Sequence, residues 1–175
     1  MIADDGCVKS GEVVPRDADH VHFGKGQSEG TIYLAPGTHE LCLQAADGTH
    51  HALDATDTVT VDVGITDRDE WCAVSGSLDE LFSSAEDADD DFLATQVAYE
   101  NIRRMLAQLR DALDEVDSEL RPDLADRMDD ASTIATAYVE ADDQDAAEAA
   151  IAAAFGPQGI QYETPGRASV GTMCE

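Results

Sequence analysis

The chain has 175 residues, with 38 acidic and 10 basic side chains, so its formal net charge is −28 at pH 7. Because a surface this acidic repels phosphate backbones and anionic lipid, the composition argues against nucleic acids and anionic membranes as partners. The sequence lacks an apolar run of the roughly 18 residues that a transmembrane helix requires. The hydrophobic content of 43% is nevertheless sufficient for a folded core.

The first part of the chain, residues 1–65, carries the period-two alternation of apolar and polar side chains that is typical of β-strands. Met1–Ala3 fits the end of one strand, and further strands are expected at 19–24, 30–35, 39–45 and 58–65. Pro-Gly and Asp-Gly turn signals separate them. Short strands with regular turns predict a small antiparallel β-sandwich. A sandwich of this length is marginal unless a cross-link or a neighbour supports it.

From Thr66 onward the apolar spacing changes to the 3.6-residue period of amphipathic helices. A capping sequence at 66–69 begins the first helix, and the second is expected from about 90 to 117. Pro122 opens the third helix, and a fourth follows Asp142 and stops at Gly156. The chain is therefore predicted to be α+β, with an antiparallel β-sandwich domain at 1–65 and a three- to four-helix bundle at 66–175.

Two cysteines fall in each half of the chain, Cys7 and Cys42 in the first and Cys72 and Cys174 in the second. Of the three possible pairings, only Cys7–Cys42 with Cys72–Cys174 keeps each bridge inside its own domain. Closing these loops would stabilise the fold by about 4 and 4.7 kcal/mol, and the second bridge would pin the C-terminal tail. Disulfides imply an oxidising compartment. The alternative is four buried free thiols in a cytosolic protein; the spacings suit zinc poorly because no CxxC pair occurs.

All five histidines lie in the first domain: His20, His22, His39, His50 and His51. On a strand, His20 and His22 would share one face about 6.6 Å apart, a spacing that suits chelation. Because His39 and the pair His50-His51 each follow a predicted turn, all five can gather at one end of a small sandwich. Three or more neutral imidazoles suit copper or zinc. The alternative is that His20 and His22 face solvent while His39 and His50 bind loop carbonyls.

The sequence gives weaker evidence for catalysis than for metal binding. Asp47 stands beside His50 and His51, with Glu29 and Glu40 nearby in the sequence. Such carboxylates can act as general bases or accept hydrogen bonds from metal-bound imidazoles. Carboxylates are so frequent in this chain that this pairing is expected by chance. Since no hydrolase or metalloprotease motif of the GxSxG or HExxH type occurs, an enzyme is not expected.

Three motifs follow one another in the first domain: His22-Phe-Gly-Lys-Gly-Gln-Ser-Glu29, Leu34-Ala-Pro-Gly-Thr-His39-Glu-Leu41 and Ala46-Asp-Gly-Thr-His50. Together they resemble the C-terminal part of the bacterial family called domain of unknown function 4399, over about residues 1–64. The resemblance implies a β-sandwich located outside the cytoplasm. It implies no particular activity, because the activity of that family is uncharacterised.

The start of the chain conflicts with export, because it has neither the basic nor the apolar segment of a signal peptide. The family pattern carries a further histidine-rich strand upstream, and Met1-Ile-Ala-Asp-Asp resembles the continuation of that strand. We therefore expect Met1 to be an internal methionine of an exported precursor. The signal peptide, the first strands and the upstream histidines of that precursor are then absent from this chain.

Residues 66–175 resemble, more loosely, helical regions of exported actinobacterial proteins with one cysteine in the first helix and another near the C-terminus. Trp71-Cys72 and Met173-Cys174 carry this likeness, which supports the second bridge. From all these features we expect a non-enzymatic, extracytoplasmic binding module, either secreted or in the cell envelope. The alternative is a copper- or zinc-binding protein that uses the histidines of the first domain. The sequence does not identify a partner or an oligomeric state.

Overall fold

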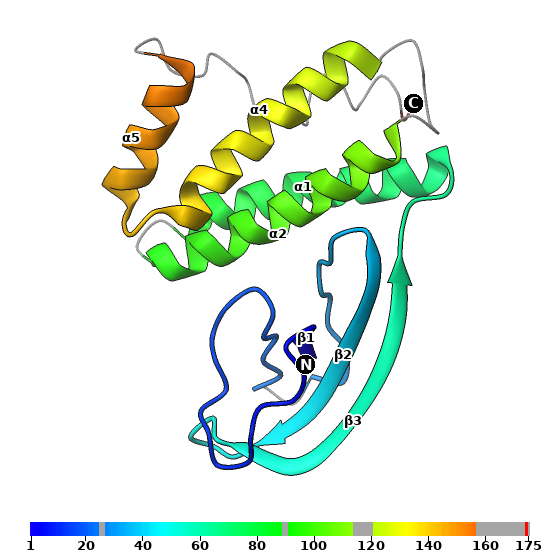
Figure 1. Cartoon of the computed structure of the whole chain (residues 1–175), viewed down its shortest axis with the longest axis vertical. Helices are drawn as coiled ribbons and strands as arrows, with labels where there is room; N and C mark the ends of the chain where they lie inside the picture. The colour runs from blue at the N-terminus through cyan, green and yellow to red at the C-terminus, as the bar shows by residue number, and fades with distance from the viewer. Residues whose placement is uncertain (25–26, 89–90, 114–120, 157–173, 175) are drawn as a thin grey trace. The chain divides into compact units, whose positions relative to one another are not determined.

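The computed structural model describes residues 1–24, 27–88, 91–113, 121–156 and 174. The chain divides into two compact units, Met1–Val63 and Gly64–Glu175 (Figure 1). The first unit contains the strands and the second contains the helices, which confirms the predicted α+β class. Within the described residues, no helix is both long and apolar enough to cross a bilayer.

The first unit is built on a three-stranded antiparallel sheet in the order β1-β2-β3. Its strands are β1 (Ile2–Ala3), β2 (Gly37–Ala46) and β3 (Ala52–Val63). Ile2 lies opposite Cys42, and Leu41 lies opposite Val59. Figure 1 shows β2 and β3 curving together, with β1 on their concave side. The Thr and Val residues of β3 favour this extended backbone because their branched side chains pack well on a pleated surface.

The expected β-sandwich is not what the structure has: the described part of the first unit holds this one sheet. The segments 19–24 and 30–35 were expected to be strands, but neither is a strand in the structure. In the first of them, His20 makes an isolated bridge to Ile2. The described part of the first unit has a single sheet, and the two segments expected to add strands to it are not strands.

Local side-chain contacts explain why the two segments do not join the sheet. The Asp17 carboxylate accepts a hydrogen bond from the Asp19 backbone N–H at 3.0 Å and another from His20 Nδ1 at 2.6 Å. Contacts of this kind compete with ladder formation. Farther along, the Phe23 ring lies against Gly30, where an added Cβ would stand 2.6 Å from the ring. Both segments are therefore held as loops by contacts that period-two alternation does not reveal.

The apolar core of the first unit is small. Its buried apolar residues are Ile2, Ala3, Ala18, Leu34, Cys42 and Ala52. Cys42 is fully buried at the middle of β2, and it pairs with Cys7 at a Cα–Cα distance of 5.6 Å. Beside this bridge, Gln44 accepts from the Val8 N–H and donates to the Val8 carbonyl, at 2.9 and 2.7 Å. The bridge and these two bonds attach the N-terminal segment to β2.

Four helices are described in the second unit: α1 (Arg68–Asp87), α2 (Phe92–Asp111), α4 (Arg121–Glu140) and α5 (Gln144–Phe155). The helix count agrees with the prediction. Asp67, Asp91 and Asp143 cap α1, α2 and α5, because each carboxylate accepts a backbone N–H from the first turn. The expected end of the second helix near 117 and most of the tail 157–175 lie outside the described residues.

Helix packing in the second unit is specified by polar contacts as well as by apolar side chains. Trp71 of α1 is fully buried, and its Nε1 donates to the Leu109 carbonyl of α2 at 3.0 Å. Gln96 of α2 donates to carbonyls at the end of α4, including Ala141 at 2.9 Å. Cys72 of α1 pairs with Cys174 at a Cα–Cα distance of 5.6 Å. Both cysteine pairs are those expected from the sequence.

Replacing Cys7 and Cys42 together with alanine is expected to destabilise the first unit by about 4 kcal/mol, because a loop of 35 residues is no longer closed in the unfolded chain. Amide hydrogen exchange of β2 and β3, measured without reductant, checks this. The double variant should lose most of the protection in the sheet. The matched control replaces Cys72 and Cys174 and should leave that protection unchanged; equal protection in both double variants would contradict the prediction.

Candidate functional site

A pocket of about 700 Å³ opens on the first unit. Its walls come from the start of the chain, from Val21–Gly24, and from the end of β2 with the following turn. Val21, Phe23 and Leu43 supply apolar surface, and two imidazoles with several amide and hydroxyl groups supply polar surface. Mixed walls of this kind are typical of small-ligand sites.

Two histidines of the pocket, His22 and His50, face each other. Their ring centroids lie 5.3 Å apart, and the ring planes are inclined by 59°. His22 Nε2 donates to the Pro15 carbonyl at 2.8 Å. Because a carbonyl can only accept, this bond places the hydrogen of the neutral ring on Nε2 and leaves a lone pair on Nδ1. The pair can therefore bind a hydrogen-bond donor or a metal ion.

The turn between β2 and β3 holds His50 in place. Asp47 Oδ1 accepts hydrogen bonds from the Thr49 N–H, the Thr49 hydroxyl and the His51 N–H, at 2.8, 2.7 and 3.0 Å. His50 itself has φ of 64°, in the left-handed region, and its N–H donates to the Asp47 carbonyl at 3.0 Å. A non-glycine residue at this φ costs on the order of 1 kcal/mol. The hydrogen bonds of the turn offset that cost and fix the direction of the His50 side chain.

These hydrogen bonds also change the acidity of Asp47. The His51 backbone N–H, followed by the hydroxyl and N–H of Thr49, lowers the pKa of the Asp47 carboxyl from 3.8 to about 2. The carboxylate is therefore charged whenever the turn is formed near neutral pH. Its Oδ1 accepts from the two N–H groups and the hydroxyl of the turn, and a carboxylate with a pKa of about 2 is a weak base, so Asp47 has a structural role and the general-base alternative is not supported.

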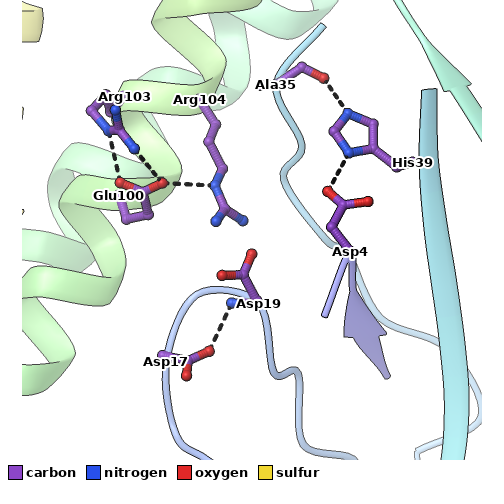
Figure 2. A network of polar contacts seen from close by, with 8 residues as sticks. All are labelled: Asp4, Asp17, Asp19, Ala35, His39, Glu100, Arg103 and Arg104. Carbon is purple, nitrogen blue, oxygen red and sulfur yellow. Dashed lines mark hydrogen bonds and ion pairs between the residues drawn. The ribbon is translucent and has the colours of Figure 1, made fainter. Parts of the chain in front are cut away.

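The other three histidines lie outside the pocket lining. His20 is buried, with Nδ1 bonded to Asp17. Figure 2 shows His39 between two acceptors: Nδ1 donates to the Asp4 carboxylate at 2.7 Å and Nε2 to the Ala35 carbonyl at 2.8 Å. With both nitrogens donating, this ring has no lone pair for a metal. His51 Nδ1 lies 2.9 Å from the Thr49 hydroxyl oxygen.

The structure thus brings together two of the five histidines proposed as metal ligands, His22 and His50. Over the described residues, no group of three or more His, Cys, Asp or Glu side chains is placed to hold a metal ion. The shared strand face expected for His20 and His22 is absent because their segment is not a strand. Glu29 and Glu40 are exposed and do not line the pocket.

A second charged cluster lies on α2, which the sequence analysis did not single out. Glu100 accepts hydrogen bonds from Arg103 Nε at 2.7 Å and from Arg104 Nε at 3.0 Å (Figure 2). Burial raises the pKa of Glu100, but the hydrogen bonds and charges of both arginines outweigh burial and lower it. The spacing of i, i+3 and i+4 on one helix is the signal that could have identified this cluster. Its ion pairs stabilise the helix surface.

Comparison with known families finds a match that covers the first unit. Residues 1–64 match the model of the family described as domain of unknown function (DUF4399). This match confirms the resemblance drawn from the three histidine-containing motifs. Neither the curated proteins nor the solved structures contain a match to this chain.

The lowered pKa of Asp47 predicts how the stability of the turn changes with pH. Because its folded-state pKa of about 2 lies below 3.8, ionised Asp47 stabilises the turn above pH 3.8, and this contribution is lost as the pH falls through 2. NMR titration of the carboxyl carbon should give a midpoint near 2. A midpoint near 3.8 would show that the three hydrogen bonds are not made in solution.

Two substitutions separate the charge of Asp47 from its geometry. Asp47→Asn keeps one side-chain oxygen as an acceptor, so the nuclear Overhauser contact between His22 and His50 should persist without titration between pH 4 and 2. Asp47→Ala removes all three side-chain bonds, and the contact should disappear. Persistence of the contact in the alanine variant would show that the turn does not position His50.

Proposed function

We propose that the first unit is a non-enzymatic binding module that takes a small ligand in the pocket between His22 and His50. The supporting observation is the facing pair of imidazoles in a pocket of ligand size, with one ring held by a carbonyl and the other by the turn. Ser28 is part of the pocket lining, but among the described residues no hydrogen bond joins its hydroxyl to the imidazole of His22 or His50. Binding therefore fits the geometry better than catalysis does.

The charge of the pocket restricts the ligand. Asp47 is part of the lining, and the described lining contains neither Lys nor Arg. The chain as a whole carries −28. An anionic ligand would meet repulsion from the charge of the whole chain and from Asp47, which the Met1 ammonium beside Val21 offsets only in part. We infer that the ligand is neutral or cationic.

We further propose that the protein works outside the cytoplasm, secreted or in the cell envelope, and that the two units are separate domains. The support is that each unit contains its own cysteine pair, with both Cα–Cα distances at 5.6 Å. Disulfides persist in oxidising compartments and are rare in the cytosol. Thiol counting of the native protein under denaturing, non-reducing conditions should find no free thiol. Four free thiols would remove the argument for export.

The binding proposal is tested with a small-molecule panel sorted by charge. Neutral or cationic compounds are expected to shift the NMR signals of the His22 and His50 rings, whereas anions should not. Replacing both residues with alanine should weaken binding at least tenfold, which corresponds to about 1.4 kcal/mol. His51→Ala, in the same turn but outside the pocket lining, is the matched control and should bind normally. Equal affinity of all three proteins would contradict the proposal.

A copper- or zinc-binding protein is the second candidate, and the hydrogen bond from His22 to Pro15 favours it. A ligating histidine usually donates its other ring N–H to a carbonyl or carboxylate, which orients the free nitrogen toward the metal. His22 has that arrangement, and His50 is its neighbour. Two imidazoles alone would leave positions on the metal for water or for a ligand.

Calorimetric titration separates the two candidates. For a metal-binding protein, Cu(II) or Zn(II) should bind one ion per chain at pH 7. The affinity should fall in His22→Ala and in His50→Ala, but not in His51→Ala. Absence of binding heat with both metals would eliminate the metal candidate and leave the organic-ligand proposal standing.

A further inference from the structure

Strand β3 lies at an edge of the sheet. It pairs with β2 on one side, and the strand order ends there. On the other side, Gly11 and Glu12 bond to Ala52 at the very start of the strand. Of the described residues, none makes a backbone hydrogen bond to this outer edge beyond Ala52. Ten residues of strand, 54–63, therefore present an open edge.

The backbone groups on that edge follow from the register. Asp4 N–H donates to the Glu40 carbonyl, so the backbone groups of Glu40 point toward β1. Because neighbouring residues of a strand alternate, those of Leu41 point toward β3, where Val59 lies opposite. The N–H and C=O groups of the residues on either side of Val59 then point outward. Thr56, Thr58, Thr60 and Asp62 form this outward set.

One hydrogen bond supports this assignment independently. The Thr58 N–H donates to Oδ1 of Asp57 at 3.0 Å, which is possible because that N–H is not used in the ladder with β2. The Asp57 carboxylate thus lies at the open edge. It accepts a hydrogen bond from one of the outward N–H groups, that of Thr58, and it presents a negative charge to any strand that approaches.

Exposed apolar side chains adjoin the edge. Val59 is 55% exposed and Leu43 is 58% exposed. Val59 is opposite Leu41 and Leu43 is opposite Asp57, so all four side chains share one face of the hairpin. An added strand could cover Val59 while it paired with the edge. Exposed edges of this kind are templates for a further strand.

The negative charge of the hairpin indicates which kind of strand would bind at the open edge of β3. From Gly37 to Val63 the hairpin contains five acidic residues and neither Lys nor Arg; the acids are Glu40, Asp47, Asp54, Asp57 and Asp62. A second copy of this chain would bring another −28 to the interface. A basic strand would instead meet the three acidic residues of β3 itself, Asp54, Asp57 and Asp62.

We propose that the outer edge of β3, from Thr56 to Asp62, is a docking site for an extended basic segment of a partner protein. The segment alternates Lys or Arg with β-branched apolar residues. Main-chain hydrogen bonds to Thr56 and Thr60 supply the pairing, and a basic side chain pairs with Asp57. None of the edge residues from Thr56 to Asp62 lines the histidine-lined pocket, although the neighbouring Leu43 does, and the proposal does not depend on the proposed function.

The probe is a synthetic peptide, Val-Lys-Val-Lys-Val-Lys-Val, added to the full oxidised chain. Its binding should slow hydrogen exchange at the Thr56 and Thr60 amides. Thr60→Pro removes an N–H that points outward, a position where an edge strand tolerates proline. It should weaken binding at least tenfold, whereas the matched variant Thr60→Ala keeps the N–H and should bind like wild type. Equal binding by the proline and alanine variants would overturn the proposal.

Two further peptides keep the test independent of how Thr60→Pro folds. A peptide with an N-methyl group on every residue has no backbone N–H to donate from either edge, so it should bind at least tenfold more weakly than the lysine peptide. The peptide Val-Glu-Val-Glu-Val-Glu-Val should not bind to the acidic hairpin. Binding of either peptide as tightly as the lysine peptide would overturn the proposal. So would a wild-type dimer that Thr60→Pro converts to a monomer, because the occupant would then be a second copy.

Discussion

The covalent link between Cys7 and Cys42 is the constraint on which the first unit depends. Its few buried apolar side chains, three of them alanines, bury little surface, and a unit of this size rarely folds stably on such a core alone. Cys42 is the fully buried centre of β2, opposite Ile2. The link therefore attaches the N-terminal segment to a fully buried position of the sheet. The hydrogen bonds between Val8 and Gln44 extend that attachment to one residue beyond Cys7 and two residues beyond Cys42.

The pocket follows from this attachment. After the bridge, the chain runs along the turn before β3, where Val14 N–H donates to the His50 carbonyl. It then returns to β1, where Val21 N–H donates to the Met1 carbonyl at 2.8 Å. His22, directly after Val21, is thereby brought beside the turn that holds His50. Two residues 28 positions apart in the sequence meet because a cross-link and two backbone contacts fold a loop back onto the hairpin.

The sequence predicted the features that depend on the periodicity of apolar residues and on the number and distribution of the cysteines. The helices follow the 3.6-residue spacing, and an Asp side chain caps each of α1, α2 and α5. The two cysteine pairs follow from their distribution between the halves. Alternation wrongly predicted a sandwich and a shared face for His20 and His22. It does not reveal that Asp17 binds His20 three residues away and holds the segment as a loop. The facing of His22 and His50 depends on long-range contacts that no local pattern contains.

Two carboxylates of the β2–β3 hairpin have a more specific role than their share in the net charge of the chain. Most acidic residues on a surface are solvated and select nothing, since exposed charges interact weakly through water and salt. Among the acidic residues of the hairpin, Asp47 and Asp57 differ because each carboxylate accepts from backbone N–H groups, of Thr49 and His51 in one case and of Thr58 in the other. A charge held in one position repels or attracts an incoming group at a defined place. The same hairpin therefore carries one fixed negative charge at the pocket and another at its open edge.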